Sequence, residues 1–348
     1  MAARPLSFRP SRIDLLMLMV VIVWGVNHTV VKWLLIKMSP WSFNIARFTL
    51  SAAAATLLLW TTGSGLRGIP RRDLVRMIGI GLLGNTVYQA LFIQGIAWTT
   101  AGNAALFVNM SPLWTALIAA GLGADRIGAR GWGGHVVAMV GAAIVAMGGH
   151  APGGDGRPAA GWSCGGPGGS TGPSAASPWT GFGCAWWGDG LTLLASVCWA
   201  GYTVASQDLL ARHSPLRLTA VGLIIGTAGM WATSVPAVPR QDWGALTWLD
   251  WGAIAFSGLG PLVLCYTAWA EGVKHVGPSR TAVYANLIPI VGVLAAAWAL
   301  HEPLSWKRVL GAALAISGVY MARTSGPPSP PRLRRHASRT PAPTGNSS

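Results

Sequence analysis

The chain contains an internal repeat, in which residues of the first half recur in the second half at a nearly constant separation. Asn109 and Pro112 coincide with Asn286 and Pro289 at a separation of 177 residues, with no gap. Other pairs, at separations of 177 or 175 residues, are Gly95 and Gly272, Gly134 and Gly311, Gly141 and Gly318, Asp14 and Asp189, and Trp24 and Trp199. Two separations that differ by two residues indicate one duplicated unit with a small insertion or deletion. The repeat therefore predicts two similar halves around a pseudo-symmetric interface.

Apolar segments of membrane-spanning length follow one another through both copies. The chain has 348 residues, of which 52% are hydrophobic and only 10% are charged, whereas soluble domains carry about 25% charged residues. One crossing of the hydrocarbon layer takes about 20 apolar residues. Ten such segments can be identified, at 13–35, 42–60, 74–97, 101–121, 132–149, 185–207, 218–238, 249–271, 280–300 and 306–322. Backbone amides must be paired inside lipid, so we expect an all-α polytopic membrane protein with ten transmembrane helices.

The distribution of basic residues orients these spans. With both termini in the cytoplasm, 18 of the 25 Lys and Arg residues fall in inner segments and 5 in outer loops, as the positive-inside rule requires. The net charge of +15 is thus explained by topology, and no nucleic-acid partner is expected. Five spans per unit is an odd number, which inverts the second copy relative to the first. We expect a multi-pass protein of the inner membrane, with lipid around it.

Composition also divides the chain into segments. We expect a cytoplasmic tail at 1–12, a first five-span repeat at 13–149, a Gly/Pro-rich linker at 150–184, a second five-span repeat at 185–322 and a disordered basic tail at 323–348. The apolar run after the basic start shows no cleavage site and is interpreted as a retained span. Cys164 and Cys184 lie in or beside the outer loop, where they either pair or remain free thiols.

Soluble-type motifs are absent or misplaced. The sequence has no Walker motif and no HExxH. Two G-x-S-x-G matches, at 161–165 and 168–172, lie in the low-complexity linker without the strand and helix of a nucleophile elbow. The four cysteines show no metal-ligand spacing. No cofactor or metal is expected.

Titratable and charged residues inside spans are the first candidates for function. Trp24, His28 and Lys32 are spaced by four residues and form one stripe on the first helix. Lys32 either faces a pathway or extends to the lipid headgroups. His28 lies one turn deeper, and as a histidine it can link transport to protons or simply be a satisfied interior residue. Arg47, in the second span, either binds a substrate carboxylate through two hydrogen bonds or bonds backbone carbonyls.

Polar residues at matched helix breaks are the second group. Asn109 and Asn286 each precede a matched proline, Pro112 or Pro289, by one turn. The two amides either bind substrate or satisfy carbonyls that the prolines release, and the prolines themselves are structural. The other candidates for a substrate pathway are Asn85, Tyr88, Tyr266 and Tyr284. No carboxylate lies near a bilayer midplane, which disfavours cation/proton antiport and favours neutral, zwitterionic or anionic substrates.

The order of these motifs resembles the EamA-type members of the drug/metabolite transporter superfamily. The matching elements are Trp24-Gly25 with Lys32 after it, Pro40 with Arg47-Phe48, Trp98-Thr99-Thr100-Ala101 with Asn109 and Pro112, Trp199-Ala200-x-Tyr202, Ser214-Pro215, Gly277 with Arg280, Pro289, and Glu302-Pro303-Leu304 with Gly311 and Gly318. The sequence departs from the family pattern at Ala124-Asp125-Arg126-Ile127, at Gly222 in the position equivalent to Arg47, and in its long linker. The resemblance covers about 13–322. It implies a ten-helix secondary exporter of amino acids or other small metabolites, with the substrate between the repeats.

The working hypothesis is therefore a secondary transporter that works by alternating access, as a monomer or a homodimer. A membrane-embedded transferase acting on lipid is the alternative, and it would use His213 with Asp208 or His275 with Glu271. A sensor or accessory subunit that uses the basic tail is the third possibility.

Overall fold

The computed structural model describes residues 11–35, 37–63, 65, 68–98, 107–125, 127–147, 178–235, 238–292, 294 and 305–325, and all regular elements in this part of the chain are helical. The predicted all-α architecture is confirmed. Residues 1–10, 148–177 and 326–348 lie outside the described residues, as do Arg126 and Glu302. Cys164 lies in the second of these stretches. The expected linker at 150–184 is described only from Pro178 on, where it is already helical. The helix that includes Cys184 is described, but not the side chain at that position.

The helices follow the order of the predicted spans, although the helix expected to begin at 185 begins at Pro178. They are α1 (Arg12–Leu35), α2 (Pro40–Thr61), α3 (Arg71–Gly81), η1 (Leu82–Val87), α4 (Tyr88–Trp98), α6 (Ser111–Gly121), α7 (Ala129–Met147), α8 (Pro178–Leu210), α9 (Pro215–Ser234), α10 (Trp248–Gly258), η3 (Leu259–Leu264), α11 (Cys265–Val276), α12 (Pro278–Ala282), η4 (Val283–Leu287) and α14 (Trp306–Thr324). Five stretches of the described chain are long and apolar enough to cross a membrane: Arg12–Leu35, Pro40–Thr61, Arg71–Ile96, Pro215–Ser234 and Trp248–Val276.

The third and eighth helical stretches are interrupted at equivalent positions. The π-helical turns η1 and η3 lie in the middle of the stretches α3–α4 and α10–α11. They occupy Leu82–Val87 and Leu259–Leu264, which are the same positions when shifted by the repeat separation. The turn in the second copy contains Gly260-Pro261, and the equivalent turn occurs where the first copy has no proline. Such turns re-aim side chains and are common at functional sites.

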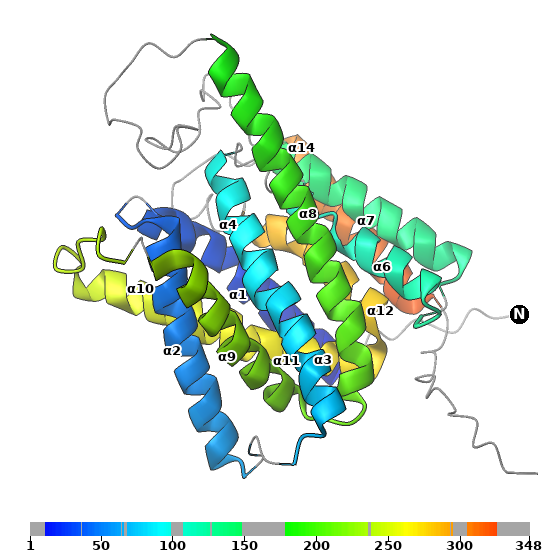
Figure 1. Ribbon diagram of the computed structural model, residues 1–348. Coiled ribbons are helices and arrows are strands. Elements are labelled where there is room, and N and C mark those ends of the chain that lie inside the picture. Colours follow the sequence, from blue (N-terminus) through cyan, green and yellow to red (C-terminus); the bar gives the residue numbers. More distant parts are fainter. Residues whose placement is uncertain are drawn as a thin grey trace, which may run out of the picture.

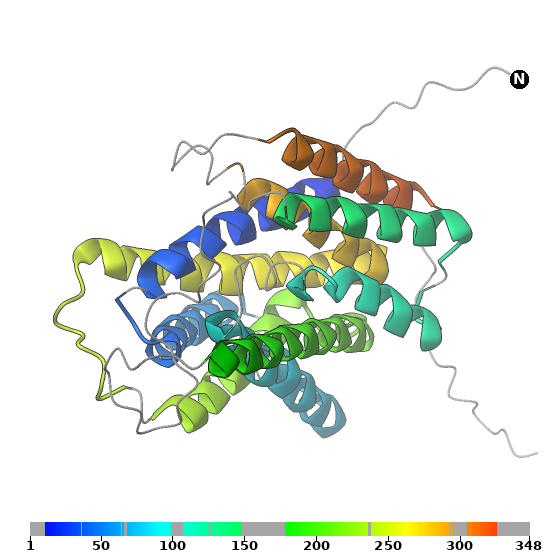
Figure 2. The same ribbon diagram turned by 90° about the horizontal axis from the view of Figure 1, so that it is seen from above.

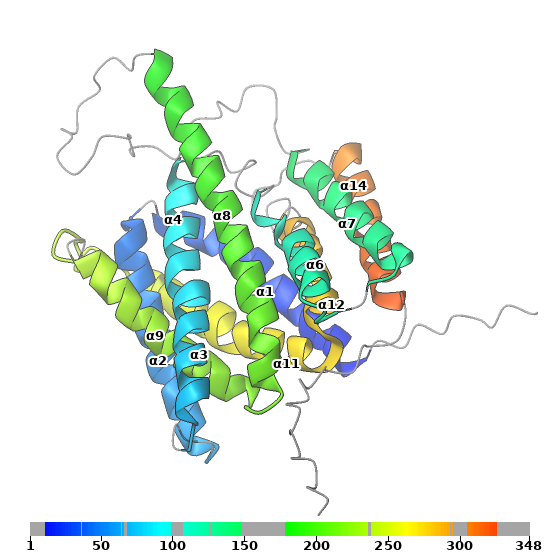
Figure 3. The same ribbon diagram turned by 45° about the vertical axis from the view of Figure 1, so that its right-hand side comes forward.

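Two helices at one edge of the molecule cross through matched glycines. α7 and α14 run side by side (Figures 1 and 3). A Cβ at Gly141 would lie 2.2 Å from the backbone nitrogen of Ala315, and one at Gly318 would lie 2.2 Å from that of Ala138. The helices are antiparallel, because Gly134 faces Ala322 whereas Gly141, later on α7, faces Ala315, which is earlier on α14. Only glycine allows this backbone approach, which is the usual way that membrane helices pack without a hydrophobic driving force.

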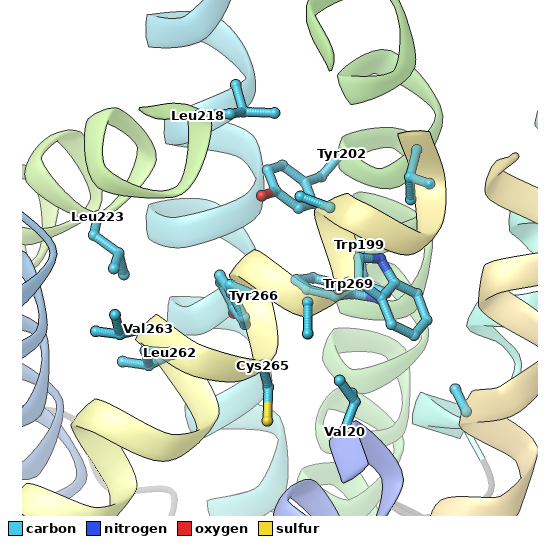
Figure 4. Close-up of a cluster of buried hydrophobic side chains, with 14 of the residues drawn as sticks. Val20, Trp199, Tyr202, Leu218, Leu223, Leu262, Val263, Cys265, Tyr266 and Trp269 are labelled. Atoms are coloured by element: carbon cyan, nitrogen blue, oxygen red, sulfur yellow. The ribbon is translucent and has the colours of Figure 1, made fainter. Parts of the chain in front are cut away.

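The remaining helices form a bundle around a central aromatic core. α4 and α8 pack side by side, as do α2 and α9, and α1 packs along α11 (Figures 1 and 2). The main hydrophobic cluster joins residues of both halves, such as Val20 from the first and Trp199, Tyr266 and Trp269 from the second (Figure 4). The core therefore lies where the two copies of the repeat meet.

Ion pairs fasten the helix turns at opposite ends of the bundle. Lys37, in the turn after α1, contacts Asp250 at the start of α10, with 2.9 Å between Nζ and Oδ1. Arg212, in the turn after α8, contacts Asp73 at the start of α3, with 3.1 Å between Nη2 and Oδ1. These two pairs are equivalent under the repeat, since Lys37 corresponds to Arg212 and Asp73 to Asp250. His213 also bonds Asp73, at 2.9 Å, instead of the expected Asp208.

Candidate functional site

A cavity of about 90 Å³ lies in the centre of the bundle. It is lined by Trp24, Asn27, Arg47, Tyr88, Gln89, Phe92, Val108, Asn109, Ser111, Ser196, Trp199, Pro261, Leu262, Tyr266, Ala285 and Ile288. These residues come from α1, α2, α4, α6, α8, η3, α11 and η4, so both halves of the chain contribute. The volume is below the roughly 300 Å³ that is typical of small-molecule sites.

Arg47 is held by neutral partners at the wall of this cavity. Its side chain sits two turns into α2, a helix that begins at Pro40 and is capped by Ser39. Nε donates to Asn44 Oδ1 at 2.8 Å, and Nη2 donates to Gln89 Oε1 at 2.8 Å. The guanidinium also packs over the ring of Phe43, 4.8 Å from its centroid. These contacts fix the orientation of the guanidinium without neutralising its charge.

Gln89 connects this arginine to the second half of the chain. Its amide nitrogen donates to the hydroxyl oxygen of Tyr266 at 3.1 Å, and the two residues are 177 positions apart. They are therefore equivalent positions of the repeat in direct contact. Such a contact places the pseudo-symmetry axis of the repeat at the cavity.

Trp199 is the centre of an aromatic cluster that forms one wall. Its ring lies 5.1 Å from the rings of Tyr88 and Tyr266, and 5.6 Å from that of Trp24, its equivalent in the first copy. Figure 4 shows Trp199, Tyr266 and Trp269 grouped between neighbouring helices. The Trp24 indole donates to the carbonyl of Pro261 at 3.2 Å, so the π-turn η3 is tied to α1. Aromatic faces of this kind suit an apolar or planar ligand.

Five of the ten predicted pathway residues line the cavity. These are Trp24, Arg47, Tyr88, Asn109 and Tyr266. His28 and Lys32 lie on α1, but their side chains are outside the described part of the chain. Asn27, Gln89, Ser196 and Trp199 also line the cavity and were not among the candidates. The repeat held a signal for two of them, because Trp199 is equivalent to Trp24 and Gln89 to Tyr266.

The other three predicted residues lie away from the cavity. Asn85 is buried in η1 and packs closely against α9. A Cβ added to Gly226 of α9 would lie only 2.4 Å from the Cβ of Asn85. The Tyr284 hydroxyl donates to Asp14 Oδ1 at 2.5 Å, next to the ion pair of Asp14 with Arg323. Asn286 is buried and donates to the carbonyl of Val283 at 3.0 Å within η4.

The two matched prolines lie at comparable places in the helices. Pro112 lies in the first turn of α6. Pro289 follows the 3-10 turn η4. Both prolines therefore stand where a helix starts or changes its pitch.

A larger hollow, of about 490 Å³, lies between α2 and α9. It is lined by Ala52, Ala53, Thr56, Leu57, Trp60, Ile224 and Thr227. No charged side chain lines it, and Trp60 and Leu57 are exposed. Its chemistry is that of a lipid-facing groove, so the polar central cavity is the candidate site.

Comparison with protein families matches residues 11–147 and 186–324 to the EamA-like transporter family. Similar proteins include "Uncharacterized transporter YyaM" of Bacillus subtilis, 27% identical over 86% of this chain and 89% of that protein. "Probable terminal-alkyne amino-acid exporter" of Streptantibioticus cattleyicolor is 26% identical, over 86% and 92% of the two chains. "Probable amino-acid metabolite efflux pump" of Salmonella typhimurium is 22% identical, over 88% and 93%.

A solved structure, described as a crystal structure of a protein, has the same fold. It superposes with a TM-score of 0.68 and covers 90% of this chain and 98% of the other, at 19% identity. This likeness establishes the fold alone.

Proposed function

Because the chain belongs to the EamA-like transporter family, we propose that it exports amino acids or similar small metabolites, which bind in the central cavity. The family and the apolar helices make it a multi-pass membrane protein. The names of the relatives from Streptantibioticus and Salmonella support the substrate class. Location in the inner membrane with both termini in the cytoplasm remains part of the proposal and rests on the distribution of basic residues.

One observation carries this proposal: equivalent residues of the two copies touch each other at the cavity. Trp24 contacts Trp199, and Gln89 contacts Tyr266. A site on the symmetry axis of two inverted copies is equally related to both sides of a membrane, which is what alternating access requires. Two further features recur in both copies and support the inverted arrangement. They are the π-turns and the equivalent ion pairs Lys37–Asp250 and Arg212–Asp73, which lie at opposite ends of the bundle.

The packing supports two moving bodies that each mix helices of both copies. α1 and α2 pack on α10, η3 and α11, whereas α8 and α9 pack on α3, η1 and α4. We propose that these two bundles rock against each other about the α2–α9 contact. Lipid against the groove between α2 and α9, and a monomeric or homodimeric state, belong to the same proposal.

The enzyme alternative finds less support in the arrangement of its candidate residues. His213 is engaged with Asp73 at a helix start. His275 contacts Glu271 one turn earlier on α11, 3.4 Å away, and both side chains are exposed. Exposed pairs of this kind are usually solvated surface features. We therefore propose a transporter without enzymatic activity.

Transport by reconstituted protein tests the proposal. Purified protein in proteoliposomes should take up labelled phenylalanine or leucine faster than empty vesicles do. Val108→Trp fills the cavity wall and should block this uptake. Ile316→Trp, on an exposed position of α14, is the matched control and should not. Uptake that is equal to that of empty vesicles across a panel of amino acids and related metabolites would remove the basis for the proposal.

A further inference from the structure

Arg47 is a buried charge that no described residue of opposite charge contacts. Only 3% of the residue is exposed. Its hydrogen bonds go to the amide oxygens of Asn44 and Gln89, and its guanidinium faces the rings of Phe43 and Phe48. No ion pair joins it to a described carboxylate. Nη1 makes no hydrogen bond to the described residues.

The cavity beside Arg47 contains no described acidic side chain that could supply the missing charge. Its lining has amides, hydroxyls and aromatic rings. The carboxylates Asp14, Asp73 and Asp250 are each engaged at helix starts with Arg323, Arg212 or Lys37. An unpaired ion in a low-dielectric interior is costly unless a counter-charge accompanies it. None of the described residues supplies a counter-charge to Arg47, and a ligand bound in the cavity can do so.

We propose that Arg47 is the specificity residue for an anionic group of the transported molecule, and that this group is a carboxylate. The inference rests on the proposed transport through this cavity and defines its substrate more closely. A guanidinium forms strong, charge-assisted hydrogen bonds to a carboxylate. Here Nε and Nη2 are held by Asn44 and Gln89, which orients the group, and Nη1 remains available to the ligand.

The remaining lining describes the other end of the ligand. Trp24, Tyr88, Phe92, Trp199 and Tyr266 present aromatic surface. A small carboxylate with an apolar or aromatic body fits both parts of the cavity. Asn27 also lines the cavity, and its amide oxygen has no hydrogen-bond partner among the described residues. This oxygen can accept a hydrogen bond from a donor on the ligand, such as an ammonium group.

Three probes that share a phenyl ring separate these contributions. They are 3-phenylpropanoate, with only the carboxylate, L-phenylalanine, with both charges, and phenethylamine, with only the ammonium. Binding to purified full-length protein is measured as the shift of its melting temperature with probe concentration. The first two should bind at least about tenfold more tightly than phenethylamine, because charge-assisted hydrogen bonds are the strong ones. Arg47→Gln should abolish this preference, and Arg47→Lys should retain part of it.

A second variant keeps Arg47 and supplies the counter-charge from the protein. Gln89→Glu has nearly the same shape and places a carboxylate at the atom that already lies 2.8 Å from Nη2. It should raise the melting temperature of the ligand-free protein, since a buried charge becomes paired. It should also weaken the binding of 3-phenylpropanoate at least about tenfold, because the site is already neutralised. This variant remains informative if Arg47→Gln does not fold.

Several outcomes would overturn the inference. Equal binding of phenethylamine and 3-phenylpropanoate by the wild type is one, and unchanged carboxylate binding in Gln89→Glu is another. Absence of a shift with any carboxylate probe at millimolar concentration also rejects it, as does an equal shift with chloride or phosphate alone. The transport proposal can fail separately. Carboxylate binding without any flux in proteoliposomes would refute transport, whereas flux of metabolites that is insensitive to Arg47→Gln would refute only the role of Arg47.

Discussion

At the scale of single residues, Gln89 links the two chemically different walls of the site. It accepts a hydrogen bond from Arg47 and donates one to Tyr266, so it joins the charged wall of the cavity to the aromatic one. All three side chains are buried. Buried donors and acceptors that lose a partner keep their desolvation cost. The rigidity of the arginine therefore depends on a neutral residue from another helix.

Replacing Gln89 by leucine should therefore destabilise the protein and disorder Arg47. We expect Gln89→Leu to lower the free energy of unfolding by about 2 kcal/mol, because the guanidinium and the tyrosine hydroxyl each lose a bond. The measurement is thermal unfolding in detergent, followed by the KM for transport, which should rise. Gln94→Leu is the control, since Gln94 lies on the same helix, half-buried and outside the cavity lining. An equal effect of both changes would contradict the assigned contacts.

Asp73 is a second residue with several partners. It accepts from His213 at 2.9 Å and from Arg212 at 3.1 Å, and its side chain is 4% exposed. Asp73→Asn should lower the free energy of unfolding by about 1–3 kcal/mol, since bonds to charged groups are replaced by weaker neutral ones. Thermal unfolding of Asp208→Asn provides the comparison, because Asp208 is exposed. A larger effect of Asp208→Asn would instead support the alternative in which His213 acts together with Asp208.

At the scale of elements, the sequence predicted the helices well and their interruptions only in part. Long apolar runs can only be helices in lipid. The two matched prolines lie at the start of α6 and just after the turn η4. The turn η1 covers LLGNTV, without proline. No local propensity marks it, and only the repeat separation from η3 points to it.

The candidate site shows the same limit. Charged or aromatic residues inside spans, such as Arg47 and Tyr266, could be selected because their burial is costly or conspicuous. Tyr284 and Asn85 satisfied the same criterion, yet they bond Asp14 and pack on α9. Which face of a helix meets the cavity depends on packing between distant segments. A single sequence does not specify that packing.

The crossing of α7 and α14 provides a prediction for elements. Gly141→Ala or Gly318→Ala should force the helices apart and lower the free energy of unfolding by about 1–3 kcal/mol, because each new methyl would overlap the facing backbone. Gly133→Ala, on α7, is the control, since its Cβ would meet only the end of Met321 at 3.8 Å. Thermal unfolding in detergent measures all three. If the crossing glycines tolerate alanine as Gly133 does, close backbone contact is not what joins these helices.

At the scale of the whole molecule, two equivalent ion pairs lie within the two proposed moving bundles, and a hydrogen bond of another kind is among the contacts between them. Lys37–Asp250 connects α10 to the turn between α1 and α2, and Arg212–Asp73 connects α3 to the turn between α8 and α9. Between the bundles, the backbone nitrogen of Ser279 in α12 donates to Asp125 Oδ2 at 3.2 Å, just after α6. α6 packs on α8, and α12 follows α11. Contacts of the first kind should persist through a transport cycle, and the Asp125–Ser279 contact should break.

Cysteine cross-links distinguish these two kinds of contact. In a protein with its four native cysteines replaced, bridging Asp125→Cys to Ser279→Cys with a short thiol reagent should stop transport, because it holds one end of the cavity closed. Bridging Lys37→Cys to Asp250→Cys should leave the transport rate within about twofold of the unbridged protein, because both residues move with the same bundle. Reversal of the first bridge by reduction should restore flux. If the second bridge also stops transport, the moving bodies are divided differently, and the two copies of the repeat themselves become the candidates.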